Sequence, residues 1–288
     1  VELEWCDRRL LARIHGLTLK PLRSEIEPVG PADFMRFLFR WQHLAPGTRL
    51  FGVDGTAAVL ERLQGYESAA VAWESSLLPS RVSDYQPQFL DQLCLSGQFG
   101  WGRISSVISF GEPGEEAERK VRPTRLAPVA FFRRENAHTF LRAVPEEVPE
   151  ETQDTLKLSH AGREVLEHLE RKGASFFQDL VRSVGRLPVE VESALWELVA
   201  AGLVSADGFA NLRALIDPQL RQAGNRNPRR RLRRLQNLST GRWTVLRSFR
   251  EGMQTDEESR TVSESGLEFL ALQLLQRWGV FFRDLLLR

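Results

Sequence analysis

The 288-residue sequence predicts a mainly α-helical fold with small β elements, because it contains one helix-rich unit twice and the start of a third copy. The clearest copy spans 173–204 and ends in a Leu-x-x-Leu-x-x-x-Gly pattern, which 89–99 repeats. Residues 279–285 repeat the opening of that copy, one residue shorter. Internal repeats of this kind define the architecture of a chain. A unit of helix, helix, helix and then β structure is typical of a winged helix, so we expect tandem winged-helix domains with a small antiparallel β-barrel or sheet.

Periodicity and turn residues place the elements in order along the chain. Apolar residues in 32–42 recur with the i, i+3, i+4, i+7 spacing of a helix, and Pro31 suits its first turn. Ser159 is expected to cap the first helix of the clearest copy. The other expected helices are 8–14, 56–63, 69–78, 87–96, 160–172, 175–184, 188–201, 209–216 and 264–278, and the expected strands are 99–110, 121–134 and 242–247.

These elements divide the chain into five expected parts. Residue 1 is Val, and Arg288 falls inside a helix whose apolar side needs later partners, so we expect a segment of a longer polypeptide. The parts are an N-terminal helical region at 1–68, a winged helix with β-barrel strands at 69–144, a winged helix at 155–218, an Arg-rich linker and strand at 219–250, and the start of a further winged helix at 251–288.

Composition narrows the class of protein. A hydrophobic fraction of 42% is ample for packed cores, and the net charge of +1 gives no global field that would point to nucleic acid. Cys6 and Cys94 are too few for a disulfide framework or a cysteine-rich zinc site, which favours a reducing interior. Because no apolar run approaches ~18 residues and no signal peptide stands at the start, we expect a soluble, cytoplasmic protein.

Nucleotide hydrolysis and metal chemistry are not expected from the motifs. The chain has neither a Gly-x-x-x-x-Gly-Lys-Ser/Thr phosphate loop nor an Asp-Glu-x-His motif after a strand. Its five histidines lie singly, without the spacing of zinc ligands. The sequence therefore predicts no metal site and no cofactor in this chain.

Arginine is concentrated near the last predicted strand. Residues 218–250 contain ten Arg and no acidic residue, which fits phosphate neutralisation without sequence readout, or equally a solvated linker.

Aromatic residues beside basic ones, at 101–103 and 242–243, can stack on unpaired bases, or they can be core residues at strand ends. The helix 188–201 carries three Glu and no Lys or Arg, so it is expected to pack within the fold rather than to read the major groove. The expected DNA-contacting residues are Trp101, Arg103, Lys120, Arg122, Arg125, Arg229, Arg230, Arg231, Arg233, Arg234, Arg242 and Trp243, and no catalytic residue is assigned.

Several ordered stretches resemble the C-terminal region of Lhr, the large helicase-related proteins of bacteria. The resemblance runs through nearly the whole chain apart from 111–120, the acidic stretch 145–154 and the Arg-rich linker. It implies a superfamily-2 DNA helicase whose ATPase lobes, with their ATP and Mg²⁺, precede Val1. The stretches include Glu4-Trp5-Cys6-Asp7-Arg8-Arg9-Leu10, Trp73-Glu74-x-x-x-Leu78-Pro79, Leu90-Asp91-x-Leu93-Cys94, Ala194-Leu195-Trp196-Glu197-Leu198 and Gly241-Arg242-Trp243.

The same resemblance implies an array of winged helices with a small β-barrel, similar to alkyl-DNA glycosylases of the AlkZ type. Those enzymes use a Gln-x-Gln or Gln-x-Asp pair, but Gln64 and Glu67 stand three residues apart here, so no catalytic role is carried over. The expected function is a DNA-binding and assembly region of an ATP-dependent DNA-repair helicase. The alternative is a DNA glycosylase that excises uracil or an alkylated base. The expected partners are single-stranded or damaged DNA and the helicase core of the same polypeptide, at the bacterial nucleoid, with self-association left open and no membrane.

Overall fold

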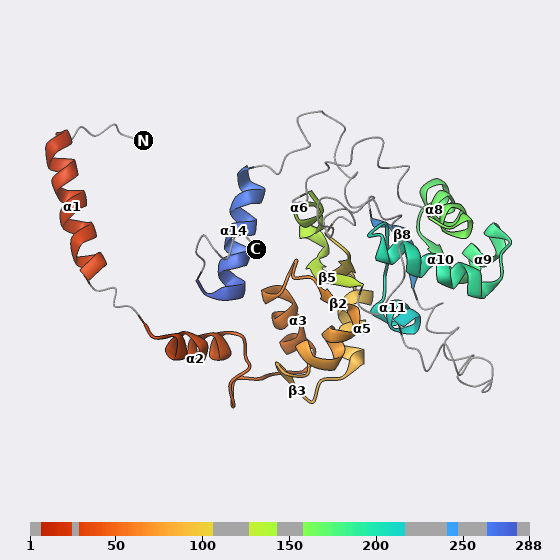
Figure 1. The fold of residues 1–288 in the computed structure, drawn as a ribbon, viewed down its shortest axis with the longest axis horizontal. Helices are drawn as coiled ribbons and strands as arrows, with labels where there is room; N and C mark the ends of the chain where they lie inside the picture. The colour runs from red at the N-terminus through yellow and green to blue at the C-terminus, as the bar shows by residue number, and fades with distance from the viewer. Residues whose placement is uncertain are drawn as a thin grey trace, which may run out of the picture.

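The computed structural model describes residues 7–24, 29–105, 127–142, 158–216, 241–246 and 264–280. Helices predominate in these ranges, and the strands form three small sheets (Figure 1). The N-terminal helix α1 (Arg8–Ser24) stands apart from the body of the molecule, and its residues 8–15 are all exposed. Most of the remaining elements form two similar modules, which lie side by side in the body.

The first module is a three-helix unit closed by an antiparallel sheet. Trp73 is fully buried at its centre, where its ring packs edge to face against Phe131, with 4.8 Å between ring centroids. The Trp73 Nε1–H donates a hydrogen bond to the Val129 carbonyl at 2.8 Å, which fixes the helices to the sheet. The sheet order is β2-β5-β4. The elements are α3 (Gly52–Arg62), β2 (Ser68–Ala69), α4 (Ala70–Ala72), the π-helical turn η1 (Trp73–Leu77), α5 (Pro87–Leu95), β4 (Phe99–Gly102) and β5 (Pro128–Arg133).

The second module repeats this order of elements and has the corresponding strand order, β6-β8-β7. Ser159 caps α8 as expected, because its Oγ accepts a hydrogen bond from the Gly162 N–H at 3.0 Å. Gly185 ends α9 with a φ of 66°, in the left-handed region that side chains with a Cβ rarely adopt. In the described part of the connection between the last two strands, the helix α11 has no counterpart in the first module. The elements are α8 (His160–Lys172), β6 (Ser175–Phe176), α9 (Phe177–Val184), α10 (Pro188–Ala200), β7 (Val204–Ala206), α11 (Phe209–Ile216) and β8 (Arg242–Val245).

The two modules share one hydrophobic core, and their sheets meet at β4 and β7. Trp101 of β4 and Trp243 of β8 are both fully buried and pack edge to face, with 6.4 Å between ring centroids. The Ser205 hydroxyl of β7 donates a hydrogen bond to the Trp101 carbonyl. Among the described residues, the sheets are therefore joined by side-chain contacts that include this hydrogen bond, and β4 and β7 do not pair through their backbones.

Helix α11 ties the second module to the helices of the first. The Arg213 guanidinium forms ion pairs with Glu74 of η1 at 2.7 Å and with Asp91 of α5 at 3.0 Å. Burial by itself lowers the pKa of Arg213, but the hydrogen bonds that it donates to both carboxylates outweigh this effect and raise the pKa above its usual value. The Tyr85 hydroxyl donates a further hydrogen bond to Glu74 at 2.9 Å. This cluster spans the boundary between the modules.

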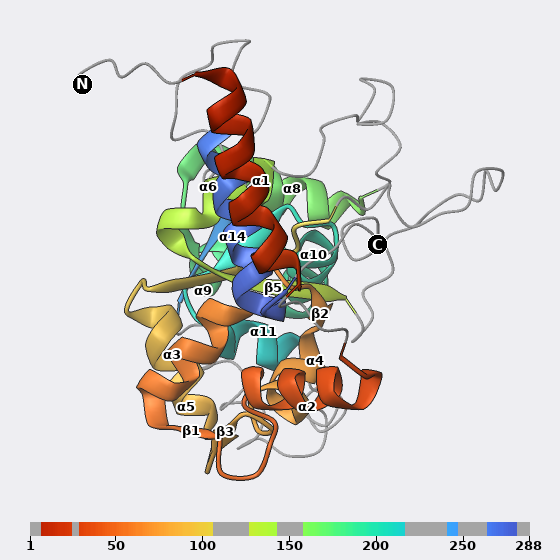
Figure 2. The ribbon, with the colours of Figure 1, turned by 90° about the vertical axis from the view of Figure 1, so that its left-hand side faces the viewer.

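The C-terminal helix and α2 lie against the first module (Figure 2). Phe269 of the C-terminal helix packs on Phe140, with 5.6 Å between ring centroids. At the other end of that helix, the Gln276 carbonyl accepts a hydrogen bond from Trp41 Nε1 at 2.9 Å. These outer elements are α2 (Pro31–Trp41), the 3₁₀ turn η3 (Arg134–Asn136), α6 (Ala137–Arg142), α14 (Glu264–Trp278), and a parallel pair of two-residue strands, β1 (Leu50–Phe51) and β3 (Val82–Ser83).

Most of the expected elements are present, and of the expected antiparallel barrel or sheet the described residues show small sheets. Within the described ranges the strands form three separate sheets and no closed barrel. Closing a barrel requires the two edge strands of a sheet to pair with each other, whereas β4 instead lies against β7 of the neighbouring module. The expected strand at 99–110 ends at Gly102, and the expected positions 106–126 lie outside the described residues.

Replacing Arg213 with methionine is expected to destabilise the chain by about 3 kcal/mol, because it leaves Glu74 and Asp91 partly buried without a counter-charge. Urea unfolding of the full chain measures this change. Arg182→Met is the control, since Arg182 forms an exposed pair with Asp179 and its removal should cost no more than about 0.5 kcal/mol. Equal effects of the two substitutions would contradict this role of Arg213.

Candidate nucleic-acid interface

The two tryptophans expected to contact DNA lie in the core. Trp101 and Trp243 are each 0% exposed, and the Trp101 ring also packs edge to face on Phe209 at 6.0 Å. A base can stack only on an accessible ring face. This burial corrects the stacking role and supports the alternative, in which both tryptophans are core residues at strand positions.

Arg103, the expected contact beside Trp101, is engaged within the protein. Its Nη1 donates a hydrogen bond to the Ala200 carbonyl at the end of α10, 2.6 Å away, and its Nε lies 3.3 Å from the Ser105 hydroxyl. Burial lowers the pKa of Arg103, and the Glu67 carboxylate partly offsets this effect. The described contacts thus give Arg103 a role in joining the modules.

Arg242, at the start of β8, is exposed and shares one carboxylate with a second arginine. Its Nε donates to Asp207 Oδ2 at 3.0 Å, while Arg134 Nη2 lies 3.3 Å from Asp207 Oδ1. Burial alone would raise the pKa of Asp207, but the hydrogen bonds from Arg242 and Arg134 outweigh it and hold the pKa below its usual value. Because two arginines share one carboxylate, the end of the second sheet at which β8 begins carries an excess positive charge.

The other expected contacts cannot be placed on the structure. They lie outside the described residues and stay predictions: Lys120, Arg122, Arg125, Arg229, Arg230, Arg231, Arg233 and Arg234.

The third helix of each module is engaged in packing. Residues 194–200 of α10 are all buried, and Glu197 accepts hydrogen bonds from the backbone and side chain of Ser159, at 2.8 and 2.5 Å. Helix α5 carries no Lys or Arg, and its Asp91 is paired with Arg213. These contacts agree with the expectation that α10 packs within the fold.

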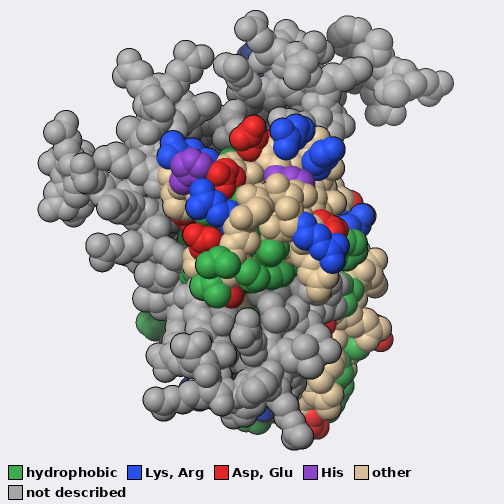
Figure 3. All heavy atoms as spheres, turned by 90° about the vertical axis from the view of Figure 1, so that its right-hand side faces the viewer, with side chains coloured by type: hydrophobic (Ala, Val, Ile, Leu, Met, Phe, Trp, Pro, Cys, Tyr) green, Lys and Arg blue, Asp and Glu red, His purple; other side chains and the backbone are tan. Residues whose placement is uncertain are grey.

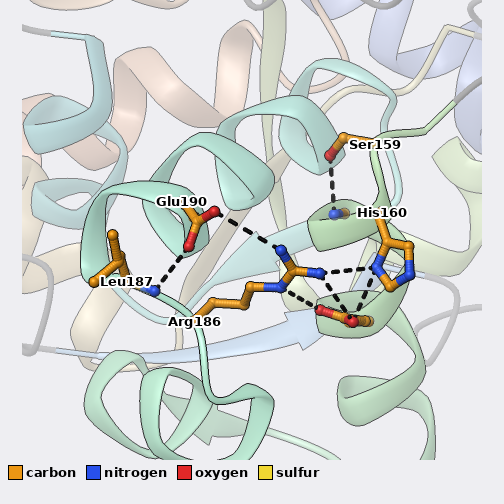
Figure 4. A network of polar contacts seen from close by, with 7 residues as sticks. Ser159, His160, Arg186, Leu187 and Glu190 are labelled. Atoms are coloured by element: carbon orange, nitrogen blue, oxygen red, sulfur yellow. Dashed lines mark hydrogen bonds and ion pairs between the residues drawn. The ribbon is translucent and has the colours of Figure 1, made fainter.

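The face formed by α8 and α9 carries both signs of charge (Figure 3). Arg186 lies between Glu164 at 2.8 Å and Glu190 at 3.8 Å, and His160 Nδ1 lies 2.9 Å from Glu164 and 3.0 Å from Arg186 Nη2 (Figure 4). The hydrogen bond from Arg186 holds the pKa of Glu164 below its usual value. Because each cation in this network has a neighbouring anion, the network is not a single-sign patch of the kind that attracts phosphate.

The residues nearest to a glycosylase-type pair are engaged with backbone groups. Gln64 is buried, and its Oε1 accepts a hydrogen bond from the Arg133 N–H at 3.0 Å. Glu67 accepts hydrogen bonds from the backbone N–H groups of Ile104 and Ser105. Both side chains therefore fix the first module internally.

Membrane spans and metal sites are both absent from the described ranges. The helices of these ranges include none long and apolar enough to span a membrane. The same ranges contain no group of three or more His, Cys, Asp and Glu side chains placed to hold a metal.

Three helices closed by a small antiparallel sheet, as in the first module, define a winged-helix domain. Residues 29–122 match the family described as the large helicase-related protein, winged-helix domain, and this part of the chain belongs to that family.

The chain is also similar along most of its length to two curated relatives. It is 33% identical over 259 residues, which are 84% of this chain and 16% of the relative, to the Lhr helicase/probable uracil glycosylase of Mycolicibacterium smegmatis. It is 26% identical over 315 residues, 97% of this chain and 18% of the relative, to the Lhr helicase/uracil glycosylase of Escherichia coli. The chain spans less than a fifth of the length of these relatives. The expected resemblance to Lhr is confirmed, and the likeness to AlkZ-type glycosylases stays a prediction.

Trp243→Ala is expected to destabilise the chain by about 4 kcal/mol, because it opens a cavity where Trp243 packs on Trp101. Urea unfolding measures the change. Normal stability combined with a selective decrease in DNA affinity would instead restore the stacking role.

Asp207→Asn is expected to remove a pH-dependent part of the stability. The pKa of Asp207 is lower in the folded chain than its ordinary value of 3.8, so the carboxylate stabilises the fold above that value and loses this effect as pH falls through the folded pKa. The difference in unfolding free energy between wild type and Asp207→Asn, measured in urea from pH 3 to 6, should be constant above pH ~5 and shrink below ~4. The exposed Asp179→Asn serves as the control, and an equal pH dependence in both variants would refute the assignment.

Proposed function

We propose that this chain is a DNA-binding and assembly region of a large helicase-related DNA-repair helicase, built from tandem winged helices. The observation that carries the proposal is the match of 29–122 to that family's winged-helix domain. The second module supports it, because its strand order, β6-β8-β7, corresponds to β2-β5-β4 of the first. The proposed partners are single-stranded or damaged DNA and the helicase core of the same polypeptide, at the bacterial nucleoid. ATP and Mg²⁺ belong to that core in this proposal.

DNA contact is proposed to fall on the wings, which are the connections between the last two strands of each module. The first wing joins β4 to β5 across 103–127, and the second joins β7 to β8 across 207–241. Cations on such loops neutralise phosphates without reading bases. All of the expected basic contacts fall in these connections or at their ends: Arg103, Lys120, Arg122 and Arg125 in the first, and Arg229, Arg230, Arg231, Arg233, Arg234 and Arg242 in the second.

The alternative function is excision of uracil or an alkylated base. The printed names of both relatives, which include uracil glycosylase, favour it. The engagement of Gln64 and Glu67 with backbone groups counts against a water-activating role for either. Incubation of the chain with uracil- or alkyl-base oligonucleotides, followed by alkali, separates the two functions, because strand breaks at the lesion would establish the enzyme.

Replacing Arg229, Arg230 and Arg231 with Ser is expected to weaken binding to single-stranded DNA and to flatten the plot of log K against log salt. The slope should fall by about 0.7 for each phosphate that the protein no longer neutralises. Fluorescence anisotropy of a labelled oligonucleotide at several salt concentrations measures both quantities.

The control for this experiment removes the same number of charges from exposed positions of α8 and α9, as Arg171→Ser/Lys172→Ser/Arg182→Ser. It should change affinity and slope much less. If the wing variant keeps the wild-type slope while the control variant flattens it, the contact surface lies on the helices and the wing proposal fails.

A further inference from the structure

A cavity of about 200 Å³ lies between the C-terminal ends of α2 and α14 and the end of α3. Most of its lining residues are apolar or aromatic, and they include Phe39, Tyr66 and Trp278. The two helices approach closely here, since a Cβ on Gly279 would clash with the Phe37 ring. The cavity is open on one side and lies between elements that are about 200 residues apart in the sequence.

Two guanidinium groups, those of Arg81 and Arg277, line this cavity without a carboxylate partner among the described residues. Arg81 Nη1 donates to the Leu77 carbonyl at 3.0 Å, and its Nη2 lies 3.3 Å from Gln42 Oε1. Arg277 Nη2 donates to the Gln64 carbonyl. The Nε of each arginine is buried and makes no hydrogen bond within the described ranges.

Other half-buried arginines without a carboxylate within 4 Å among the described residues are held by different groups, as Arg103 is by the Ala200 carbonyl and the Ser105 hydroxyl. Arg62 also has no carboxylate partner in the described part of the chain, but its guanidinium lies over the Trp41 ring, 4.9 Å from the centroid, and it does not line the cavity. Four others each have a carboxylate within 4 Å: Arg133 with Glu61, Arg134 with Asp207, Arg186 with Glu164, and Arg213 with Glu74 and Asp91.

Two like charges held in a partly desolvated cavity oppose folding. Burial lowers the pKa of both arginines, to about 10 for Arg277, so both remain protonated at neutral pH. The Tyr66 ring, 5.6 Å from the Arg277 guanidinium, offsets only part of this cost. A bound anion would neutralise the two guanidinium groups and so remove this electrostatic cost. The pair is therefore better suited to bind a ligand than to stabilise the fold.

We propose that this cavity is a phosphate subsite that takes one nucleotide of a DNA strand. Guanidinium forks match the geometry of phosphate oxygens, and Tyr66 and Trp278 offer aromatic surface to the attached base. The volume is below the ~300–1,000 Å³ typical of complete small-molecule sites, which fits one unit of a longer ligand. The anion site stands on its own geometry, whereas its assignment to DNA rests on the proposed function.

Thermal unfolding of the full chain tests the anion site directly. Inorganic phosphate and thymidine monophosphate should each raise Tm relative to chloride at equal ionic strength. The nucleotide should raise it more, by about 5 °C at a hundredfold excess over Kd. In Arg81→Gln/Arg277→Gln this rise should disappear, while the Tm without added anion stays equal or increases. Arg62→Gln is the matched control and should keep the rise.

Several outcomes would overturn the proposal. The anion site is refuted if the Tm responds to neither anion, or if the response survives the double substitution. The assignment to a nucleotide is refuted if phosphate and nucleotide shift the Tm equally, or if a Glu-rich peptide shifts it more than the nucleotide does. If the Gln variant does not fold, Arg81→Lys/Arg277→Lys keeps both charges without the forks and should reduce the shift by at least half.

Binding to single-stranded DNA separates this proposal from the wing proposal. Arg81→Gln/Arg277→Gln should lower the salt slope by about 0.7, the value for one phosphate, and the Arg229, Arg230 and Arg231 variant should keep the nucleotide-induced rise in Tm. A Tm response without any DNA binding would retain the anion site and refute the proposed function. DNA binding with an unchanged slope in the double variant would refute the subsite alone.

Discussion

The buried contact between Trp101 and Trp243 is the interaction on which the rest of the structure depends. The strands of both modules are only two to six residues long, and sheets this small need packing partners to be stable. The two tryptophans, with Phe209, provide that packing from both sides of the boundary at once. Each module completes the core of the other.

Sharing a core limits which surfaces remain for a ligand. Helix α10 is covered because its apolar residues pack in the shared core. Its Glu197 also accepts a hydrogen bond from the Ser159 N–H at the start of α8. Helix α5 lies under α11, where its Asp91 neutralises part of the Arg213 charge. The helices that correspond to base-reading helices in many winged-helix proteins therefore serve the fold here, which is why the proposed function assigns DNA contact to the connections between strands.

The sequence predicts this fold well at the level of single elements. The Leu-x-x-Leu-x-x-x-Gly repeat locates the third helix of both modules, and Ser159 marks the start of α8. Apolar alternation indicates a strand but not its neighbour, so it could not distinguish a barrel from two sheets that meet at β4 and β7. The same limit applies to Trp101 and Trp243, since a tryptophan beside an arginine fits a core strand as well as a stacking surface.

The cavity at Arg81 and Arg277 could not be predicted from sequence. The two arginines are about 200 residues apart, and neither stands in a motif. What distinguishes them is that both line one cavity with no carboxylate partner among the described residues, an arrangement that exists only once α14 lies against α2 and α3.

The joined core also sets a length scale for any strand that contacts both wings. The first wing leaves the sheet at β4 and the second at β7, and these strands are held against each other by the Ser205 hydroxyl and the Trp101 carbonyl. The points where the wings emerge cannot separate without opening the core. In the proposed function, the spacing between the starting points of the two wings is therefore fixed by the packing of the interior.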